Sequence, residues 1–321
     1  MAAMRVHLAA LLLAAAALAP AETLLVLNKE GSLAIVDPAS RKVLGTVRTG
    51  EQPHEAEASE DGKLAFVSNY GAAGAPGNTL SVIDIAARKE IHRVHLGPLR
   101  RPHGLWTIGS KVYFTAESNK MIGRYDPATN QLDWLLGTGQ NGTHMILVTP
   151  DEKTMFTANI ASNSMTIIEA AGVQNWNETV IPVGKGPEGF DLSPDGKQIW
   201  AANSQDGSVS VIDVATKKVV QTFPVQTKRS NRLKFTPDGR LVLISDLAAG
   251  ELLVLEHSTK KVLKRLPLGS SPAGILVEPS SARAYVAVTG DNNVAVIDLK
   301  TLDLEARIQT GNGPDGMAWV K

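Results

Sequence analysis

The chain has 321 residues, with 32 Lys or Arg, 32 Asp or Glu and no Cys. A chain without net charge has no general electrostatic reason to bind nucleic acid or anionic lipid. Because there is no cysteine, disulfides, thiolate nucleophiles, cysteine-ligated zinc, iron–sulfur clusters, c-type haem and a lipidated N-terminal cysteine are all excluded.

The first predicted element is a secretory signal peptide over residues 1–21. Arg5 supplies a positive charge, residues 8–19 form an apolar run of Leu and Ala, and residues 19–21 make an A-x-A cleavage pattern. A transmembrane anchor needs roughly 18 or more apolar residues, and this run has twelve. Cleavage leaves residues 22–321, with 31 basic and 32 acidic side chains and no membrane span. We therefore expect an exported protein, either periplasmic or secreted.

A repeat of about 42 residues runs through the rest of the chain. An acidic residue follows an apolar run in every unit, at Asp37, Asp84, Asp126, Glu169, Asp213, Glu256 and Asp298. A second marker opens each unit, at Pro53, Pro102, Thr143, Pro187, Ser230, Pro272 and Pro314. Both markers occur seven times, at spacings of 41 to 49 residues, so they predict seven repeats.

Residues 187–226 show the content of one unit. A first strand, GFDLS, meets the turn 194–196, in which Gly accepts a positive φ without steric cost. A second strand, KQIWAAN, ends at the hairpin signal 205–207, and the strands VSVID and KVVQTFPV follow. Four short strands in about 42 residues are typical of a propeller blade. The sequence therefore predicts an all-β fold, a seven-bladed β-propeller of four-stranded antiparallel blades.

The two ends of the chain predict how the ring closes. Residues 23–49 contain the second, third and fourth strands of a blade but no first strand. Residues 314–321 contain a first strand with nothing after it. One C-terminal and three N-terminal strands would complete the seventh blade, which protects the sheet edges. We therefore expect a single domain over residues 22–321.

The strand motifs resemble a known family. The segments FVSN (66–69), FTAN (156–159) and WAAN (200–203), together with SVSVID and the SPDG turn, are similar to the YVTN repeats of YncE-like β-propellers. The resemblance covers essentially the whole chain after the signal peptide. It implies the propeller fold and says little about function, because the motif residues are mostly turn and strand positions.

The most informative positions follow the opening markers. The first strand of a propeller blade lines the central channel, so these residues should meet at one rim. In ring order they are Asp315, His54, His103, His144, Glu188, Asn231 and Ala273, and Arg232 lies beside one of them. We predict a ligand site there, formed by His54, His103, His144, Glu188, Arg232 and Asp315. The alternative is that repeat duplication or a wet channel mouth explains these polar residues.

A second ring is predicted at the ends of the second strands, at Asn28, Asn69, Glu117, Asn159, Asn203 and Asp246. Asn and Asp bond to nearby backbone in turns, so this ring is expected to be structural. Glu117 breaks the pattern in a blade that carries a histidine, and we add it to the ligand site. The insertion 70–78 is rich in small residues and is expected to be a flexible segment on the histidine face, either a lid or a tolerated insertion.

Three functions remain open from the sequence. The leading hypothesis is a binding or scaffold protein of the cell envelope, whose partner is a small molecule or another envelope protein. The second is an enzyme, because residues 102–127 also look like blades of the streptogramin lyases, which use His, Glu and a divalent metal, and because lactonases have a similar fold. The third is a site for Zn, Cu or Mg on His54, His103 and His144. No nucleophile elbow and no Walker loop occurs in the sequence.

Overall fold

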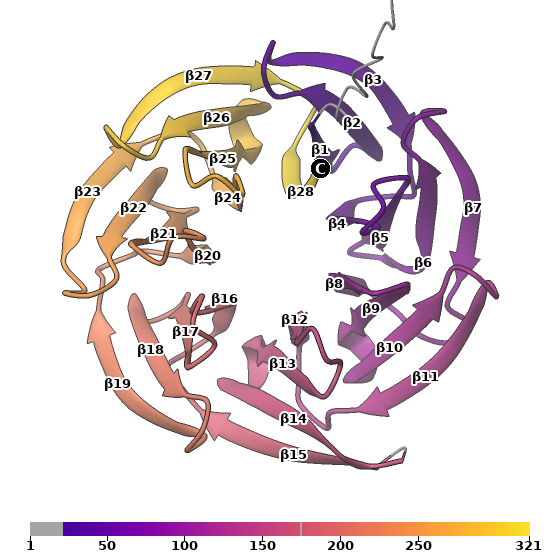
Figure 1. The fold of residues 1–321 in the computed structure, drawn as a ribbon, viewed down its shortest axis with the longest axis horizontal. Coiled ribbons are helices and arrows are strands. Elements are labelled where there is room, and N and C mark those ends of the chain that lie inside the picture. The colour runs from indigo at the N-terminus through magenta and orange to yellow at the C-terminus, as the bar shows by residue number, and fades with distance from the viewer. Residues whose placement is uncertain (1–21, 174) are drawn as a thin grey trace, which may run out of the picture.

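The computed structural model describes residues 22–321 apart from residue 174. The predicted signal peptide lies outside these residues. The described chain forms seven four-stranded antiparallel sheets arranged as blades around a central channel (Figure 1). The predicted seven-bladed propeller is therefore confirmed. Among the described residues, no helix is long and apolar enough to span a membrane.

The strands follow one another in chain order, four to a blade. Blades one to three contain β4 (Pro53–Ala58), β5 (Leu64–Ala72), β6 (Ala75–Asp84), β7 (Lys89–His95), β8 (Pro102–Ile108), β9 (Lys111–Ala116), β10 (Met121–Asp126), β11 (Gln131–Gly137), β12 (Thr143–Val148), β13 (Thr154–Asn159), β14 (Ser164–Gly172) and β15 (Asn175–Pro182). Blades four to six contain β16 (Pro187–Leu192), β17 (Gln198–Asn203), β18 (Ser208–Asp213), β19 (Lys218–Pro224), β20 (Ser230–Phe235), β21 (Leu241–Asp246), β22 (Glu251–Glu256), β23 (Val262–Pro267), β24 (Pro272–Val277), β25 (Arg283–Val288), β26 (Asn293–Asp298) and β27 (Asp303–Gln309). Three single-turn 3₁₀ helices follow second strands, at η1 (Glu117–Asn119), η2 (Ile160–Ser162) and η3 (Thr289–Asp291).

Blade seven is built from both ends of the chain, as predicted. It combines β28 (Pro314–Val320) with β1 (Thr23–Asn28), β2 (Ser32–Asp37) and β3 (Lys42–Arg48). The antiparallel pairing of β1 with β28 sets Thr23 opposite Val320 and Leu25 opposite Ala318. The innermost strand of this blade is therefore the last strand of the chain.

The hydrophobic core lies between neighbouring blades. Leu25 and Leu27 of blade seven pack in one cluster with Ala65 and Val67 of blade one, and the same arrangement recurs around the ring. Because the middle strands are covered on both faces by adjacent blades, their side chains form near-continuous buried runs. Trp200 is the largest of these side chains and is fully buried. The core therefore fixes the angle and spacing at which inner strands face one another across the channel.

The turns match the sequence expectations. Gly196 and Gly239 have φ values of 71° and 69°, in the left-handed region that favours glycine. Asp37 accepts a hydrogen bond from the backbone N–H of Ala39 at 2.9 Å, and Asp298 accepts one from Lys300 at 2.7 Å. Most of the recurring acids of the repeat are therefore turn formers, whereas Glu169 lies within β14 and forms an ion pair with Lys217.

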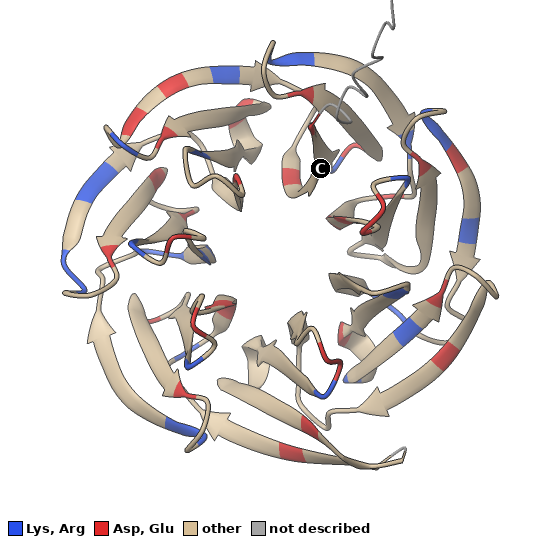
Figure 2. Cartoon of the chain, in the orientation of Figure 1, with Lys and Arg blue, Asp and Glu red and all other residues tan. Residues whose placement is uncertain are grey.

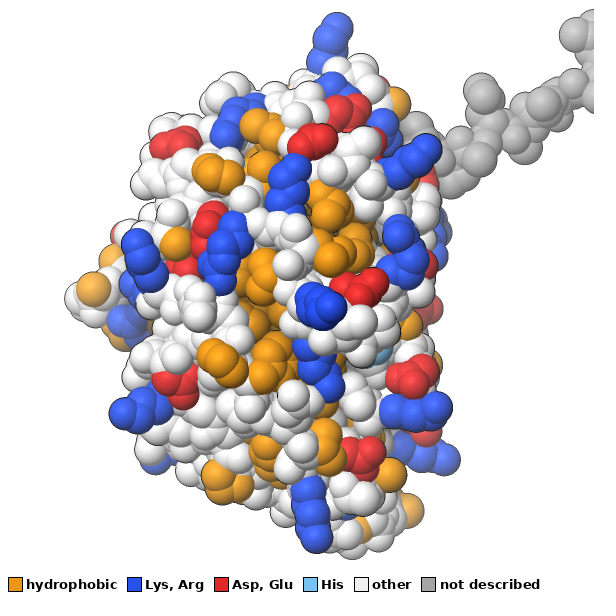
Figure 3. Space-filling view, turned by 90° about the vertical axis from the view of Figure 1, so that its left-hand side faces the viewer, with side chains coloured by type: hydrophobic (Ala, Val, Ile, Leu, Met, Phe, Trp, Pro, Cys, Tyr) orange, Lys and Arg blue, Asp and Glu red, His pale blue; other side chains and the backbone are white. Residues whose placement is uncertain are grey.

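The outermost strands carry most of the solvent-exposed edge. Charged residues of both signs are spread over these strands (Figure 2). Hydrophobic side chains gather between lysines and arginines on the side of the ring viewed in Figure 3. Exposed aliphatic residues of the outer strands include Val220 of β19 and Leu263 of β23, at 57% and 49% exposure. Charges on edge strands hinder pairing with other chains.

Candidate metal centre at the channel mouth

All seven predicted rim residues occupy the same place in the fold. Each is the second residue of an innermost strand: His54 in β4, His103 in β8, His144 in β12, and likewise Glu188, Asn231, Ala273 and Asp315. In every blade the pairing between first and second strands shifts register just after the marker residue or, in blade seven, opposite it. Such bulges re-aim a side chain and are common beside functional sites.

Hydroxyl groups of the second strands fix the histidine backbone. Ser68 donates a hydrogen bond to the carbonyl of His103 at 2.8 Å, and Thr115 donates one to the carbonyl of His144 at 2.7 Å. Thr115 also accepts from the N–H of Gly104 at 2.9 Å. Each hydroxyl thus connects its own blade to the rim of the next. The separation of neighbouring rim residues is set by these bridges and by the close approach of the inner strands.

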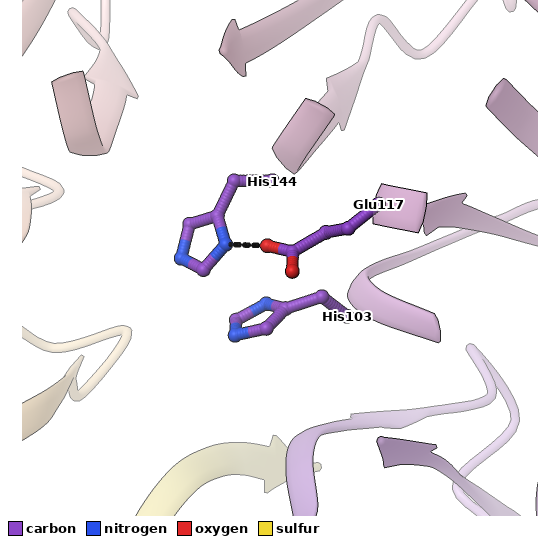
Figure 4. A group of neighbouring side chains, drawn as sticks. All are labelled: His103, Glu117 and His144. Atoms are coloured by element: carbon purple, nitrogen blue, oxygen red, sulfur yellow. Dashed lines mark hydrogen bonds and ion pairs between the residues drawn. The ribbon is translucent and has the colours of Figure 1, made fainter. Parts of the chain in front are cut away.

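Three side chains converge on the rim between blades two and three (Figure 4). One ligand atom from each of His103, Glu117 and His144 lies within 4.8 Å of the others. The imidazole centroids of His103 and His144 are 3.7 Å apart, and Nδ1 of His144 is hydrogen-bonded to a carboxylate oxygen of Glu117. Two imidazoles and a carboxylate form a ligand set suited to a first-row transition metal.

The two histidines of this group are buried, and each has one ring nitrogen without a hydrogen-bond partner among the described residues. His103 and His144 are 3% and 6% exposed. Neither Nδ1 of His103 nor Nε2 of His144 has a hydrogen-bond partner among residues 22–173 and 175–321. Burial holds the pKa of His103 well below its ordinary value, so its imidazole is neutral and keeps a free lone pair at pH 7. Buried polar atoms without a partner are rare and call for an explanation.

Tyr70 orients the carboxylate. Its hydroxyl donates to Glu117 at 2.6 Å, and the guanidinium of Arg101 lies 4.7 Å from the centre of its ring. Burial and the charge of Glu117 raise the pKa of Tyr70 to about 12, so the phenol remains a donor. Burial acts to raise the pKa of Glu117, but the hydrogen bonds from His144 and Tyr70 outweigh it and keep the carboxylate ionised.

His54 lies beside this group rather than in it. Its ring centroid is 4.8 Å from that of His103 and 4.4 Å from that of Tyr70. Nδ1 of His54 is 3.6 Å from Asp315, which pairs with Lys29 at 3.1 Å. Burial lowers the pKa of His54 to about 4, partly opposed by the charge of Asp315, so this imidazole is also neutral at pH 7.

The far side of the mouth carries charged residues from blades four and five. The guanidinium of Arg232 forms an ion pair across the channel with Glu55, which follows His54 in β4. Asn231 donates to Glu188 at 2.6 Å. A cavity of about 490 Å³ is lined by His54, Tyr70, His103, His144, Glu188, Arg232 and Asp315, together with Lys29, Arg229 and Asn231. Six of the seven predicted ligand-site residues therefore face one cavity, and Glu117 lies behind His144.

The predicted second ring needs one correction. Ala116 takes the place of the ring asparagine in blade two: it pairs with Pro102 as Asn69 pairs with Pro53 and Asn159 with Thr143. Glu117 lies one residue later, at the position of Tyr70 and Lys29 in other blades. The asparagines themselves are structural, since Asn69 bonds to Thr79 and Ser81 and Asn203 to Ser208 and Ser210.

The insertion after Asn69 also differs from the expected flexible segment. β5 continues to Ala72 and β6 begins at Ala75, so the two strands extend as a hairpin over the histidine face. The extension carries Tyr70 into the cavity wall. Sequence reasoning overlooked both Tyr70 and Lys29; the signal available was that each follows directly after a ring asparagine.

A family model described as YNCE-like beta-propeller matches residues 109–283, more than half of the chain. The chain belongs to the YNCE-like β-propeller family. The matched span includes His144, Glu117, Glu188 and Arg232, whereas His54, His103 and Asp315 lie outside it.

Solved structures similar to this YNCE-like propeller include very different proteins. Hydrazine synthase from Kuenenia stuttgartiensis superposes with a TM-score of 0.70 at 23% identity, over 83% of this chain and 89% of that chain. A candidate 6-phosphogluconolactonase from Bacteroides uniformis superposes with a TM-score of 0.75 at 16% identity, over 94% of this chain and 100% of that chain. No curated protein matches this sequence. At these identities the likeness concerns the fold alone.

Proposed function

We propose that this YNCE-like propeller is an exported binding protein whose site is a divalent transition-metal centre at the channel mouth. His103, Glu117 and His144 hold the metal, and a small molecule reaches it through the cavity. The observation that carries the proposal is the pair of buried imidazole nitrogens, on His103 and His144, that have no partner among the described residues but lie beside a carboxylate.

The chemistry of the ligand set favours Zn²⁺ or Cu²⁺ over Mg²⁺. Imidazole nitrogen suits zinc and copper, whereas magnesium prefers oxygen ligands and retains its water. Three protein ligands leave at least one coordination position for a ligand. The 490 Å³ cavity lies within the range of small-molecule sites. The three-histidine site on His54, His103 and His144 remains a prediction, but the converging group contains Glu117 in place of His54.

Metal analysis and zinc titration test the proposal. The protein is purified without chelators and its metal content is measured; zinc affinity is then determined by calorimetry for the wild type, H103A, H144A and E117Q. H103A and H144A should each weaken zinc binding by about 100-fold and E117Q by about 10- to 100-fold. The double variant H103A/H144A should be little worse than either single variant, because the residues act as one unit.

His92 provides the matched control. It is an exposed histidine on β7, away from the rim, so H92A should bind zinc as the wild type does. Urea denaturation of each variant separates loss of metal from loss of fold. Equal zinc affinity in H92A, H103A and H144A would show that the rim histidines hold no metal.

A second candidate function is hydrolysis or elimination on a small substrate, as in a lactonase or lyase. It is favoured by His54, a neutral imidazole that faces the same cavity and is backed by Asp315. A neutral imidazole can accept a proton at pH 7. Zinc-loaded protein should then open simple lactones, and H54A should remove this activity while keeping zinc. Hydrolysis at the rate of free zinc would count against an enzyme.

A further inference from the structure

The charges around the cavity can be sorted by their partners. Lys29 is paired with Asp315 at 3.1 Å, and Arg232 is paired with Glu55. Among the residues that line the cavity or hold the metal, three charged side chains remain: Arg229, Glu188 and Glu117. Arg229 is exposed, lines the cavity, and forms no ion pair within the part of the chain that the structure describes. Glu188 accepts a hydrogen bond from Asn231, which is neutral.

The net charge of the site depends on whether the metal is bound. Two carboxylates against one guanidinium give the metal-free site a net charge of about −1, which repels anions. A divalent ion on His103, Glu117 and His144 would bring the sum to about +1, because imidazole ligands are neutral. The same cavity would then attract a single negative charge.

Resting on the metal centre proposed above, we infer that the ligand of this cavity is a small monocarboxylate anion. Its carboxylate binds the metal and its remaining atoms occupy the cavity, while Arg229, which lines the cavity from blade five, attracts the anion through its charge. Carboxylate is a common oxygen ligand of zinc and also the preferred partner of arginine. Anion binding then requires bound metal, and by thermodynamic linkage the bound anion must increase the affinity of the site for the metal.

The cavity wall accommodates an organic anion rather than a bare inorganic one. Leu247, Ala248 and Ala273 contribute apolar surface, while the hydroxyl-bearing residues Ser271 and Thr289 lie at the same wall. A cavity of about 490 Å³ is larger than phosphate or sulfate needs. The polar side chains dominate the cavity wall, and the apolar residues Leu247, Ala248 and Ala273 offer a surface against which a short aliphatic chain can pack.

The experiment uses cobalt-loaded protein at pH 7, in which the visible absorption of Co²⁺ changes when a carboxylate joins its coordination shell. Propionate is titrated, with propionamide as the neutral analogue of the same shape. Propionate should shift the spectrum with saturation and propionamide should not. R229Q should weaken propionate binding by about threefold, because one favourable charge is removed from the cavity. E188Q should strengthen it by about threefold, because a like charge is removed from the cavity.

Arg48 supplies the matched control, since it is an exposed arginine on the outer strand β3 and does not line the cavity. R48Q should bind propionate as the wild type does. Metal retained with no response to propionate, the same response to propionamide, or equal affinity of R229Q and R48Q would each overturn the monocarboxylate inference alone. A protein that retains no cobalt or zinc would overturn both this inference and the proposed metal centre.

Discussion

Replacing Gly104 with alanine should separate blades two and three at the metal centre. A Cβ atom on Gly104 would lie 2.6 Å from the carbonyl oxygen of His144 and 2.9 Å from the Cα of Met145. Ordinary contacts between such atoms are about 3.5–4.0 Å, so the inner strands must move apart by roughly 1 Å. Both neighbours are backbone atoms, which cannot turn aside as a flexible side chain can. The movement would also stretch the hydrogen bond from Thr115 to the carbonyl of His144, which joins the two blades.

The expected cost is about 2–3 kcal/mol of unfolding free energy, at the upper end of overpacking changes. Metal affinity should fall about tenfold in addition, because ligand sets tolerate displacements of only about 0.5 Å. Urea denaturation measures the first effect and zinc calorimetry the second. The control is G137A on β11, where no described atom lies within 4 Å of the added Cβ. G104A that unfolds within about 0.5 kcal/mol of G137A would refute the close-approach argument.

Three further outcomes are expected. Deleting residues 314–321 removes β28 and exposes β1, so the truncated protein should aggregate or lose most of its stability; a melting curve like that of the full chain would contradict closure. G196A and G239A should each cost about 1 kcal/mol, since φ values of 71° and 69° strain any other residue; unchanged urea midpoints would exclude this strain. Burial raises the pKa of Glu57 to about 8. The folded protein therefore keeps a proton that the unfolded chain has lost, and unfolding free energy should fall by up to about 1.4 kcal/mol per pH unit between pH 4.5 and 8. E57Q should lack this slope, and equal slopes in both proteins would exclude the effect.

The sequence predicted the fold because each blade repeats the same signals. Asp37 and its equivalents follow the apolar runs of the third strands, and Pro53 and its equivalents open the inner strands, so seven copies of each marker determine seven blades. The rim residues followed from the same argument, since strand position alone decides that His54, His103 and His144 meet at one mouth. Because the blades repeat, the position of a residue within its blade can be predicted without any knowledge of side-chain packing.

Other features of the site depend on how side chains pack and reach across the channel, which the spacing of the repeat does not predict. Glu117 lies one residue beyond the predicted ring position, because Ala116 is the residue that pairs with Pro102. On the preceding strand, Phe114 packs toward blade one, in the same cluster as Phe66, while Tyr113 packs toward blade three. The pairing of Arg232 with Glu55 joins residues 177 positions apart on different blades. Such a contact follows from side-chain reach across the channel, not from the repeat.

The split blade ties completion of the site to completion of folding. β1 keeps a row of unpaired backbone groups until residues 314–320 dock against it, so blade seven cannot be complete before the C-terminal strand is in place. The same residues bring Asp315, which pairs with Lys29 of the N-terminal strands and stands beside His54. Pairing across nearly the whole chain is slow to nucleate. A chain whose ring is still open lacks the wall of the cavity that Asp315 provides. Ligand binding would therefore distinguish fully folded molecules from molecules in which blade seven is incomplete.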